Sequence, residues 1–246
     1  MTPEISVIIP CFNEEENVAP LLGELAVALR GTGRSYEIIY VDDASTDATA
    51  ERVREATQLH PELRLIRHRF NCGESAAILT GCDRAQGKIL ITMDADLQND
   101  PADIPMMLKE LDQFDCVAGV RRKRRDSFMK IASSRIANAF RDFMLNDDIH
   151  DAGCTFRVFR REAMECIVPF RGMHRFAPTM WRWQGFKVKE VPINHRPRHR
   201  GVSKYGTMNR LWVGIDDIFG MRWFHRRFIP PERMVDEPNP AEKVAP

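Results

Sequence analysis

Short runs of apolar residues rich in valine and isoleucine recur along the first half of the chain and alternate with segments of helical periodicity. The apolar runs predict strands at Ile5–Pro10, Tyr36–Asp42, Arg64–Arg69, Lys88–Met93 and Cys116–Val120. The intervening segments predict helices at Asn17–Leu29, Thr46–Gln58, Ser75–Arg84 and Pro101–Leu111. Such alternation is typical of βαβ units, so we expect an α/β fold with a mainly parallel, Rossmann-like sheet covered by helices on both faces.

The alternation stops after Val120, where a run of basic residues begins. The run consists of Arg121, Arg122, Lys123, Arg124 and Arg125. Beyond it, the pattern predicts a helix over 128–144, a strand or turn at Asp151–Phe159, a helix at Phe176–Trp183, a loop over 191–205 and a helix at Met208–Phe228. We therefore expect one main domain over 1–206, an amphipathic helix over 207–229 that lies in an interface or docks, and a flexible tail over 230–246.

Charge is distributed unevenly between the two halves, although the formal net charge is only +1. Residues 1–100 carry 9 Lys/Arg and 17 Asp/Glu, whereas residues 101–246 carry 27 and 18. A basic half is consistent with a polyanionic partner, such as nucleic acid, anionic lipid or a phosphorylated substrate, and equally with a solvated basic surface. The content of 43% hydrophobic and 29% charged residues is that of a globular protein.

Cysteine spacing and segment hydrophobicity bear on the compartment. No two of the 6 cysteines have the spacing of zinc or redox motifs, so we expect reduced thiols in a cytosolic protein. We expect no signal peptide, because the chain enters its first apolar run directly, and no uncharged stretch reaches the roughly 18–20 residues that span a bilayer. His174, His195 and His199 lack carboxylates at helical spacing, which argues against a zinc site.

Acidic residues stand at the ends of two predicted strands. Asp94 and Asp96 flank one small residue, and Gln98 follows two positions later, which offers hard oxygen ligands for Mg²⁺ or Mn²⁺. A helix start at Asp100 and Pro101 is the alternative reading of this run. Asp42 and Asp43 end an earlier strand, where a carboxylate can accept hydrogen bonds from a base or a ribose, although a following hydroxyl can also cap the next helix.

Four motifs occur in a fixed order along the chain. They are Pro10–Glu14, Val41–Asp47, Asn71 with Gly73, and Asp94–Gln98. The series resembles glycosyltransferase family 2, the inverting enzymes of the GT-A fold, and within it the polyprenyl-phosphate sugar synthase branch that includes dolichyl-phosphate mannose synthase. The resemblance runs from about Ile5 to Gly206, with Cys11 and Phe12 as mild departures from the residues that the family usually has.

The resemblance implies roles for individual residues on the donor side. The residues implied to line the nucleoside pocket are Pro10, Asn13, Glu14 and Asp42. Asp94 is implied to face the ribose and the metal, while Asp96 and Gln98 hold Mg²⁺ or Mn²⁺. The residues similar to a segment that closes over the donor diphosphate are Arg200, Gly201, Ser203 and Lys204, of which Lys204 would stabilise the departing group.

On the acceptor side, a phosphate must approach the donor diphosphate, so cations are required between them. The residues implied to bind the acceptor phosphate are Arg121, Arg122, Arg135 and Arg157, and the pattern does not determine which members of the basic run face the site. Asp151 is the one carboxylate in that region that can act as a base. A base is dispensable, because a phosphate monoester is already ionised near neutral pH.

We therefore expect an inverting transferase that moves a sugar from a UDP- or GDP-sugar to a polyprenyl phosphate. A related enzyme with a soluble or polysaccharide acceptor is the main alternative. A nucleotidyltransferase lacks support, because no Gly-rich loop follows the first strand, and a nucleic-acid binder leaves the acidic strand ends unexplained.

The lipid acceptor requires a route to a membrane. The last predicted helix combines tryptophans with arginines, which is typical of a helix in a membrane interface, and the alternative is docking onto the main domain or a partner copy. A small membrane subunit or a homodimer partner could also provide the anchor. We expect a cytoplasmic enzyme that is peripheral at the inner face of the membrane and binds no nucleic acid.

Overall fold

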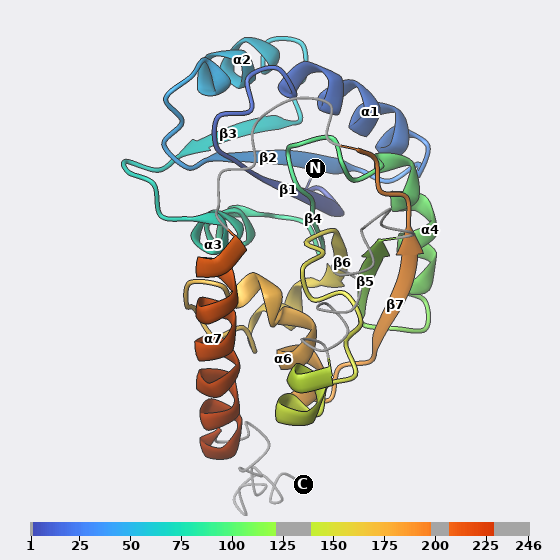
Figure 1. The fold of residues 1–246 in the computed structure, drawn as a ribbon. Coiled ribbons are helices and arrows are strands. Elements are labelled where there is room, and N and C mark those ends of the chain that lie inside the picture. Colours follow the sequence, from blue (N-terminus) through green and yellow to red (C-terminus); the bar gives the residue numbers. More distant parts are fainter. Residues whose placement is uncertain (1, 122–138, 198–206, 229–246) are drawn as a thin grey trace, which may run out of the picture.

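The computed structural model describes residues 2–121, 139–197 and 207–228, and these residues include a seven-stranded sheet (Figure 1). The strands are β1 (Ile5–Cys11), β2 (Tyr36–Asp42), β3 (Leu63–Arg67), β4 (Ile89–Thr92), β5 (Cys116–Arg121), β6 (Arg157–Arg160) and β7 (Val188–Ile193). Their order is β3-β2-β1-β4-β6-β5-β7, and only β6 runs antiparallel to its neighbours. The predicted, mainly parallel α/β sheet is confirmed.

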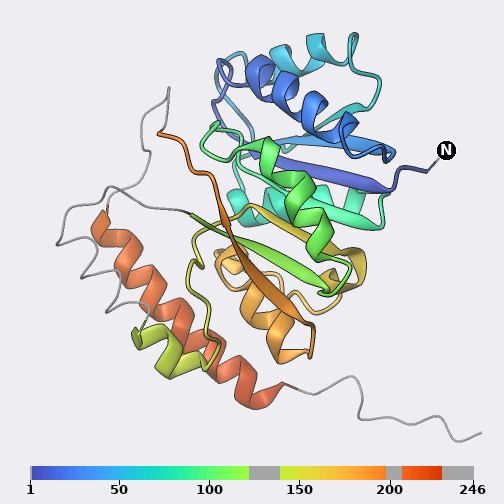
Figure 2. The ribbon, with the colours of Figure 1, turned by 90° about the vertical axis from the view of Figure 1, so that its right-hand side faces the viewer.

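Helices cover both faces of this sheet (Figures 1 and 2). The helices are α1 (Val18–Arg30), α2 (Thr49–Ala56), α3 (Glu74–Arg84), α4 (Ile104–Glu110), α6 (Ala177–Trp183) and α7 (Thr207–Arg227), with 3-10 turns η1 (Pro101–Asp103), η2 (Arg161–Met164) and η3 (Met173–Arg175). Helices α1, α2 and α4 pack on one face of the sheet, and α3, α6 and α7 pack on the other. Each group of three helices shares one apolar cluster with its face of the sheet. A further helical segment spans 139–145.

The central strands are apolar because both of their faces are buried. In β1, Val7 and Ile9 point into the cluster under α1, while Ile8 points into the cluster over α3, and all three are 0% exposed. A strand covered on both sides favours apolar side chains at successive positions, which explains the apolar runs seen in the sequence, and a buried polar residue such as Ser6 is hydrogen-bonded, here to Glu37. The same packing leaves the strand ends as the places where polar residues gather.

Strand β7 overlaps the first three residues of the stretch 191–205, which the sequence pattern predicts as a loop. This strand pairs only with β5 and lies at the sheet edge, so its side chains alternate between burial and exposure. Lys189 and Pro192 fit there, because an edge strand tolerates charged residues and a residue without a backbone donor. The pattern was wrong here because it expected the apolar composition of a central strand.

Helix α7 docks against the main domain through Ile218 and Met221, which are buried, and through an ion pair between Asp217 and Arg175. Among its described side chains, Phe219 and Trp223 are exposed on other faces, so the single apolar band expected for an amphipathic helix is not confirmed. No helix in the described parts of the chain is long and apolar enough to cross a bilayer.

Gly81 on α3 offers a test of how closely this helix packs on β1, and Gly23 on α1 is the comparison. A Cβ added at Gly81 would lie 2.3 Å from Ile8 Cγ2, whereas a Cβ at Gly23 on α1 would meet nothing within 4 Å. Gly81→Val should therefore lower the free energy of unfolding by about 1–3 kcal/mol through overpacking. Gly23→Ala should raise it by about 0.5–1 kcal/mol through helix propensity. Urea unfolding of both variants checks the pair, and equal effects would contradict this packing.

Candidate active site

The candidate site lies at the end of the sheet that is formed by the carboxyl ends of the parallel strands. Because β6 is antiparallel, its first residue, Arg157, pairs with Thr92 near the end of β4 and with Ala118 in β5. The chain leading into β6 is thereby placed beside the residues that follow β4 and β5. Carboxyl ends of parallel strands are where ligands bind in open α/β sheets.

The loops after β1 and β2 are joined to each other by side chains that bond to backbone groups. Asn13 Oδ1 accepts a hydrogen bond from the Thr46 amide at 2.7 Å, and the Asn13 amide donates to Ser45 Oγ at 2.9 Å. The amide of Glu14 donates to Thr49 Oγ1 at 2.8 Å. Asn13 has a φ of 55°, a left-handed conformation that asparagine tolerates better than most residues. The structure therefore brings Asn13 and Glu14 together with the region of Asp42.

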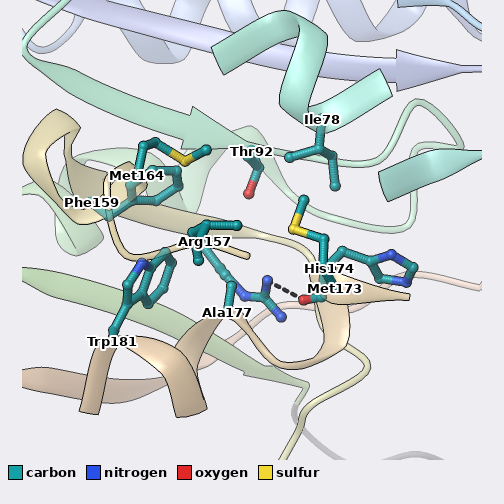
Figure 3. Close-up of a pocket in the computed structure, with 10 residues that line it drawn as sticks. Ile78, Thr92, Arg157, Phe159, Met164, Met173, His174, Ala177 and Trp181 are labelled. Carbon is teal, nitrogen blue, oxygen red and sulfur yellow. Dashed lines mark hydrogen bonds between the residues drawn. The ribbon is translucent and has the colours of Figure 1, made fainter. Parts of the chain in front are cut away.

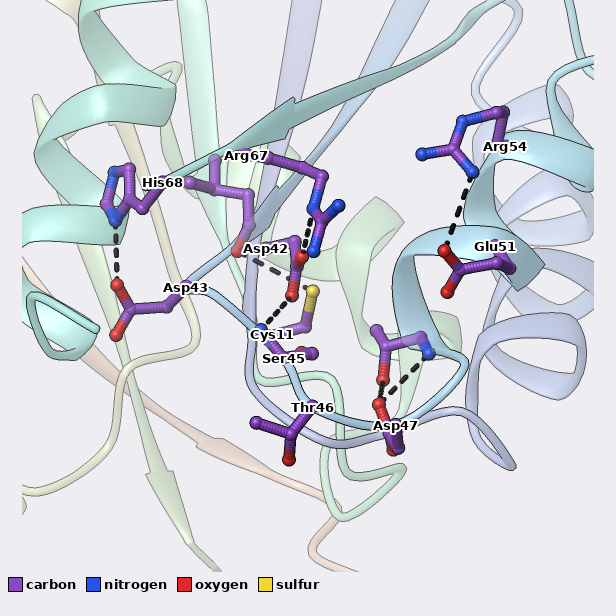
Figure 4. A network of polar contacts seen from close by, with 12 residues as sticks. Cys11, Asp42, Asp43, Ser45, Thr46, Asp47, Glu51, Arg54, Arg67 and His68 are labelled. Atoms are coloured by element: carbon purple, nitrogen blue, oxygen red, sulfur yellow. Dashed lines mark hydrogen bonds and ion pairs between the residues drawn. The ribbon is translucent and has the colours of Figure 1, made fainter. Parts of the chain in front are cut away.

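Asp42 is fully buried, and both of its oxygens are engaged (Figure 4). Oδ1 accepts from the Ser45 amide at 3.0 Å, and Oδ2 accepts from Arg67 Nε at 2.8 Å. The Asp42 carboxylate thus fixes the turn after β2 and carries an ion pair with β3. A nucleoside that reaches Asp42 must share these oxygens.

Asp43 organises the segment ahead of α3. Its oxygens accept from the amides of Cys72 and Gly73 at 2.8 and 2.7 Å, and Oδ1 lies 2.7 Å from His68 Nδ1 (Figure 4). Ligand atoms of Asp43, His68 and Cys72 lie within 4.8 Å of one another, close enough to hold a metal ion. The hydrogen bonds already account for this arrangement, in which a buried carboxylate is stabilised by backbone donors.

The acidic run forms a tight turn after β4, with Leu97 at a φ of 62°. Asp94 Oδ1 accepts a hydrogen bond from the Thr155 hydroxyl, and Asp96 Oδ1 accepts from the Gln98 amide at 3.1 Å. Burial, and then the charge of Asp96, raise the pKa of the Asp94 carboxyl above its usual range. Two neighbouring carboxylates in a buried setting repel each other, and a divalent cation would relieve this repulsion. The residues therefore fit the predicted metal.

Arg121, predicted to bind the acceptor phosphate, and Asp151, predicted as a possible base, form a bidentate ion pair with each other. Arg121 Nε and Nη2 donate to Asp151 at 2.8 and 2.6 Å, and the Arg121 amide donates to the same carboxylate at 3.2 Å. Burial lowers the pKa of Arg121, but the hydrogen bond and charge of Asp151 outweigh it and raise that pKa. With its oxygens occupied in this way, Asp151 is better suited to orienting Arg121 than to acting as a base.

Arg157, the second predicted acceptor residue that the structure describes, is buried on the side of the sheet that α3 and α6 cover. Its side chain is 3% exposed and donates to the carbonyl oxygens of His174 and Ala152. The surrounding pocket is lined mainly by apolar side chains such as Phe159 and Trp181 (Figure 3) and has room for roughly one water molecule. Burial lowers the pKa of Arg157 to about 10. Its position suits organisation of the chain around η3.

Several predicted residues lie outside the described parts of the chain. These are Arg122, Arg135, Arg200, Ser203 and Lys204.

Comparison with known proteins decides the family. The model of the family described as Glycosyl transferase family 2 matches residues 6–168, about two thirds of the chain. The chain belongs to glycosyltransferase family 2. The expected motifs after β1, β2 and β4 all fall within the matched region of the enzyme, so its assignment as a glycosyltransferase is confirmed.

Two characterised relatives show what this glycosyltransferase is similar to. It is 35% identical over 232 residues to a dodecaprenyl-phosphate galacturonate synthase of Rhizobium johnstonii, covering 91% of the chain and 68% of the relative. It is 34% identical over 215 residues to an undecaprenyl-phosphate 4-deoxy-4-formamido-L-arabinose transferase of Edwardsiella ictaluri, covering 86% and 66%. The chain thus spans about two thirds of the length of these relatives.

Solved structures share the GT-A fold. A glucosyl-3-phosphoglycerate synthase from Mycobacterium tuberculosis, in complex with Mn²⁺, UDP and glucosyl-3-phosphoglycerate, matches with a TM-score of 0.66 at 17% identity, covering 93% of this chain and 81% of that one. A mannosyltransferase from Pyrobaculum calidifontis, in complex with GDP-Man and Mn²⁺, matches with a TM-score of 0.63 at 20% identity, covering 99% and 68%. At these identities the likeness concerns the fold.

Sequence reasoning missed two residues that shape the site. The Thr155 hydroxyl donates to Asp94. The backbone of Arg196 bonds to both the backbone and the side chain of Gln98. Thr155 stands within the segment Asp151–Phe159, in which the sequence pattern and the resemblance indicate roles for Asp151 and Arg157 but not for Thr155. Arg196 stands in the stretch expected to be a loop, and no local pattern marks either contact because both join distant parts of the chain.

His174, which borders the Arg157 pocket, generates a prediction about pH. Burial, followed by the charges of Arg157 and Arg175, lowers the pKa of His174 to about 3, although Glu74 lies 3.7 Å from its Nε2. We consider the burial to dominate, because Glu74 is partly exposed and screened. The folded state therefore resists protonation of His174, and the unfolded state, with a pKa near 6.5, does not.

The stability associated with a neutral His174 is complete above pH 6.5 and is lost as the pH falls toward 3. We expect the free energy of unfolding to fall by about 2 kcal/mol from this group between pH 6.5 and pH 5. His174→Gln should flatten this part of the profile, since glutamine can still bond to Ser75 Oγ without titrating. Urea unfolding at several pH values measures the slope, and parallel profiles for the two proteins would contradict the assignment.

Proposed function

We propose that this enzyme transfers a glycosyl group, with inversion, from a UDP- or GDP-sugar to a polyprenyl phosphate, with Mg²⁺ or Mn²⁺ as cofactor. The observation that carries the proposal is the pairing of two features at one sheet edge. The acidic turn after β4 suits a metal-bound nucleoside diphosphate, and Arg121, which Asp151 orients, supplies a cation beside it, although burial and Asp96 still keep the pKa of Asp94 raised. The names of the relatives, polyprenyl-phosphate sugar transferases, support this acceptor.

Arg121 addresses the main electrostatic difficulty of the reaction, which is that two anions must meet. A guanidinium has five N–H donors, so the pair formed through Nε and Nη2 with Asp151 still leaves donors for an acceptor phosphate. Asp151 fixes the plane of this guanidinium, and a preoriented cation stabilises charge better than a mobile one. The acceptor phosphate is already ionised near neutral pH, so positioning is the main requirement.

On the donor side, Asp96 and Gln98 are proposed to hold the metal, with Asp94 facing the ribose and the metal. When bound, the cation would neutralise the diphosphate and stabilise the departing nucleoside diphosphate. The Gln98 side-chain nitrogen donates to the Arg196 carbonyl at 3.3 Å, so the side-chain oxygen is the atom proposed to bind the metal. Arg200, Ser203 and Lys204 are proposed to bind the diphosphate.

Proposed nucleoside contacts come from Pro10, Asn13, Glu14 and Asp42. A purified-enzyme assay tests the whole scheme: a panel of UDP- and GDP-sugars with Mn²⁺ or Mg²⁺, with and without polyprenyl phosphate, scored for release of nucleoside diphosphate. Release from one donor only in the presence of the lipid is expected. Release that depends on a sugar or polysaccharide acceptor instead would favour the alternative acceptor class.

Asp96→Asn isolates the charge of the proposed metal ligand, because an amide oxygen can still accept from the Gln98 backbone. We expect kcat/KM to fall at least about 100-fold while the unfolding midpoint stays unchanged. Asp112→Asn, at an exposed position after α4, is the matched control and should retain activity. Near wild-type turnover by the Asp96 variant would remove the metal site from the proposal.

The route to the lipid is proposed to be an exposed aromatic patch, defined as Phe140, Phe143, Phe219 and Trp223. Phe143 and Trp223 are 81% and 63% exposed, and Phe140 contacts Phe219 with ring centroids 6.2 Å apart. Segment 139–145 and α7 lie side by side in both views (Figures 1 and 2). Exposed arginines stand beside the patch at Arg222, Arg226 and Arg227. Aromatic rings with neighbouring arginines suit the interface of an anionic membrane at its cytoplasmic side.

Phe143→Ser combined with Trp223→Ser should weaken binding to anionic lipid vesicles about tenfold or more, because less apolar surface enters the interface. Co-sedimentation with phosphatidylglycerol vesicles measures this, and neutral vesicles serve as the charge control. Unchanged vesicle binding would contradict the patch as a membrane contact. A change in oligomeric state instead would indicate that a second copy, or a small membrane subunit, covers these rings.

A further inference from the structure

We infer that Arg196 is a positioning residue that holds the Asp94–Asn99 turn in the shape needed to bind the metal. The inference rests on the proposed function, since it concerns the same metal site. Arg196 follows β7 and lies 98 positions from Gln98 along the chain, yet the two residues pair directly. Nothing in the sequence pattern around residue 196 indicates this contact.

The Asp94–Asn99 turn needs support from outside. Leu97, at its centre, has a φ of 62°. For a residue with a side chain this left-handed conformation is unfavourable, and such conformations persist where surrounding contacts determine them. Leu97 is largely buried in the cluster under α1, which fixes one side of the turn. The opposite side is held by polar contacts with the chain after β7.

Those contacts resemble a short antiparallel pair. The Arg196 amide donates to the Gln98 carbonyl oxygen at 2.8 Å, and Gln98 Nε2 donates to the Arg196 carbonyl oxygen at 3.3 Å. Beside them, Asn99 and His195 form an antiparallel bridge. The backbone and the side chain of the proposed metal ligand Gln98 are therefore both bonded to one residue.

The guanidinium of Arg196 anchors this pair to the rest of the fold. Nη1 bonds to both oxygens of Glu24 on α1, at 2.9 and 2.7 Å, and Nη2 forms an ion pair with Asp100 Oδ1 at 2.8 Å. Asp100 Oδ1 also accepts from the Ala102 amide at the start of η1, at 3.0 Å. The planar guanidinium of Arg196 thus joins the chain that follows β7 to α1 and to the end of the turn. The single ammonium of a lysine cannot reproduce both contacts with the same geometry.

The consequence concerns the metal more than the stability of the fold. A residue that orients a ligand without touching the metal typically contributes 10- to 100-fold to metal affinity. Arg196 is also two residues before the segment 198–206, which carries the residues proposed to bind the diphosphate.

The experiment compares Mn²⁺ binding to the full chain, measured by electron paramagnetic resonance of free Mn²⁺, with and without UDP or GDP. Arg196→Gln should raise the Kd for Mn²⁺ about tenfold and raise the half-saturating Mn²⁺ concentration in turnover to the same extent, while kcat at saturating Mn²⁺ changes much less. Arg196→Lys should rescue part of the affinity. Arg34→Gln, which removes an exposed ion pair with Glu4, is the control and should bind Mn²⁺ as the wild type does.

Glu24→Gln provides a milder test, because it weakens the anchor and leaves Arg196 with its backbone pair intact. We expect a Kd about threefold higher with an unchanged unfolding midpoint. If both variants unfold earlier but bind Mn²⁺ as the wild type does, Arg196 is purely structural and the inference is wrong. If the wild type and Asp96→Asn bind Mn²⁺ equally, the proposed metal site itself is wrong, which is a distinguishable result.

Discussion

The reversal of β6 within an otherwise parallel sheet is the constraint on which the candidate site depends. Because β6 runs antiparallel between β4 and β5, its beginning lies where those strands end. The segment before it therefore places Thr155 against Asp94 and Asp151 against Arg121. A parallel strand in the same position would carry that segment to the opposite edge, away from the acidic turn.

Charge balance explains how this edge can hold so many carboxylates. Asp42 and Asp43 are buried, and backbone amides, Arg67 and His68 satisfy them, so they stabilise loops. Asp94 differs, because its burial and the neighbouring Asp96 raise its pKa. Carboxylates of the first kind stabilise loops, whereas for the second kind a bound divalent cation would relieve the repulsion between the two negative charges.

Two arginines of similar appearance in the sequence have different surroundings in the structure. Arg121 ends β5 beside the candidate site and is oriented by the carboxylate of Asp151. Arg157 begins β6 on the buried face and donates to backbone carbonyls. Successive residues of a strand point to opposite faces, so one position along the strand decides whether an arginine meets the site or the core.

The sequence by itself determined the alternation of strands and helices, the acidic strand ends and the family, because these features depend on local periodicity and on short motifs. It placed the five strands β1 to β5 within two residues of their observed bounds. Edge strand β7 escaped it, since exposure removes the apolar signal of a buried strand. Only the tertiary structure decided that Asp151 orients Arg121, that Arg157 is buried and that Arg196 supports Gln98. These outcomes depend on contacts between segments far apart in the chain, which no local pattern records.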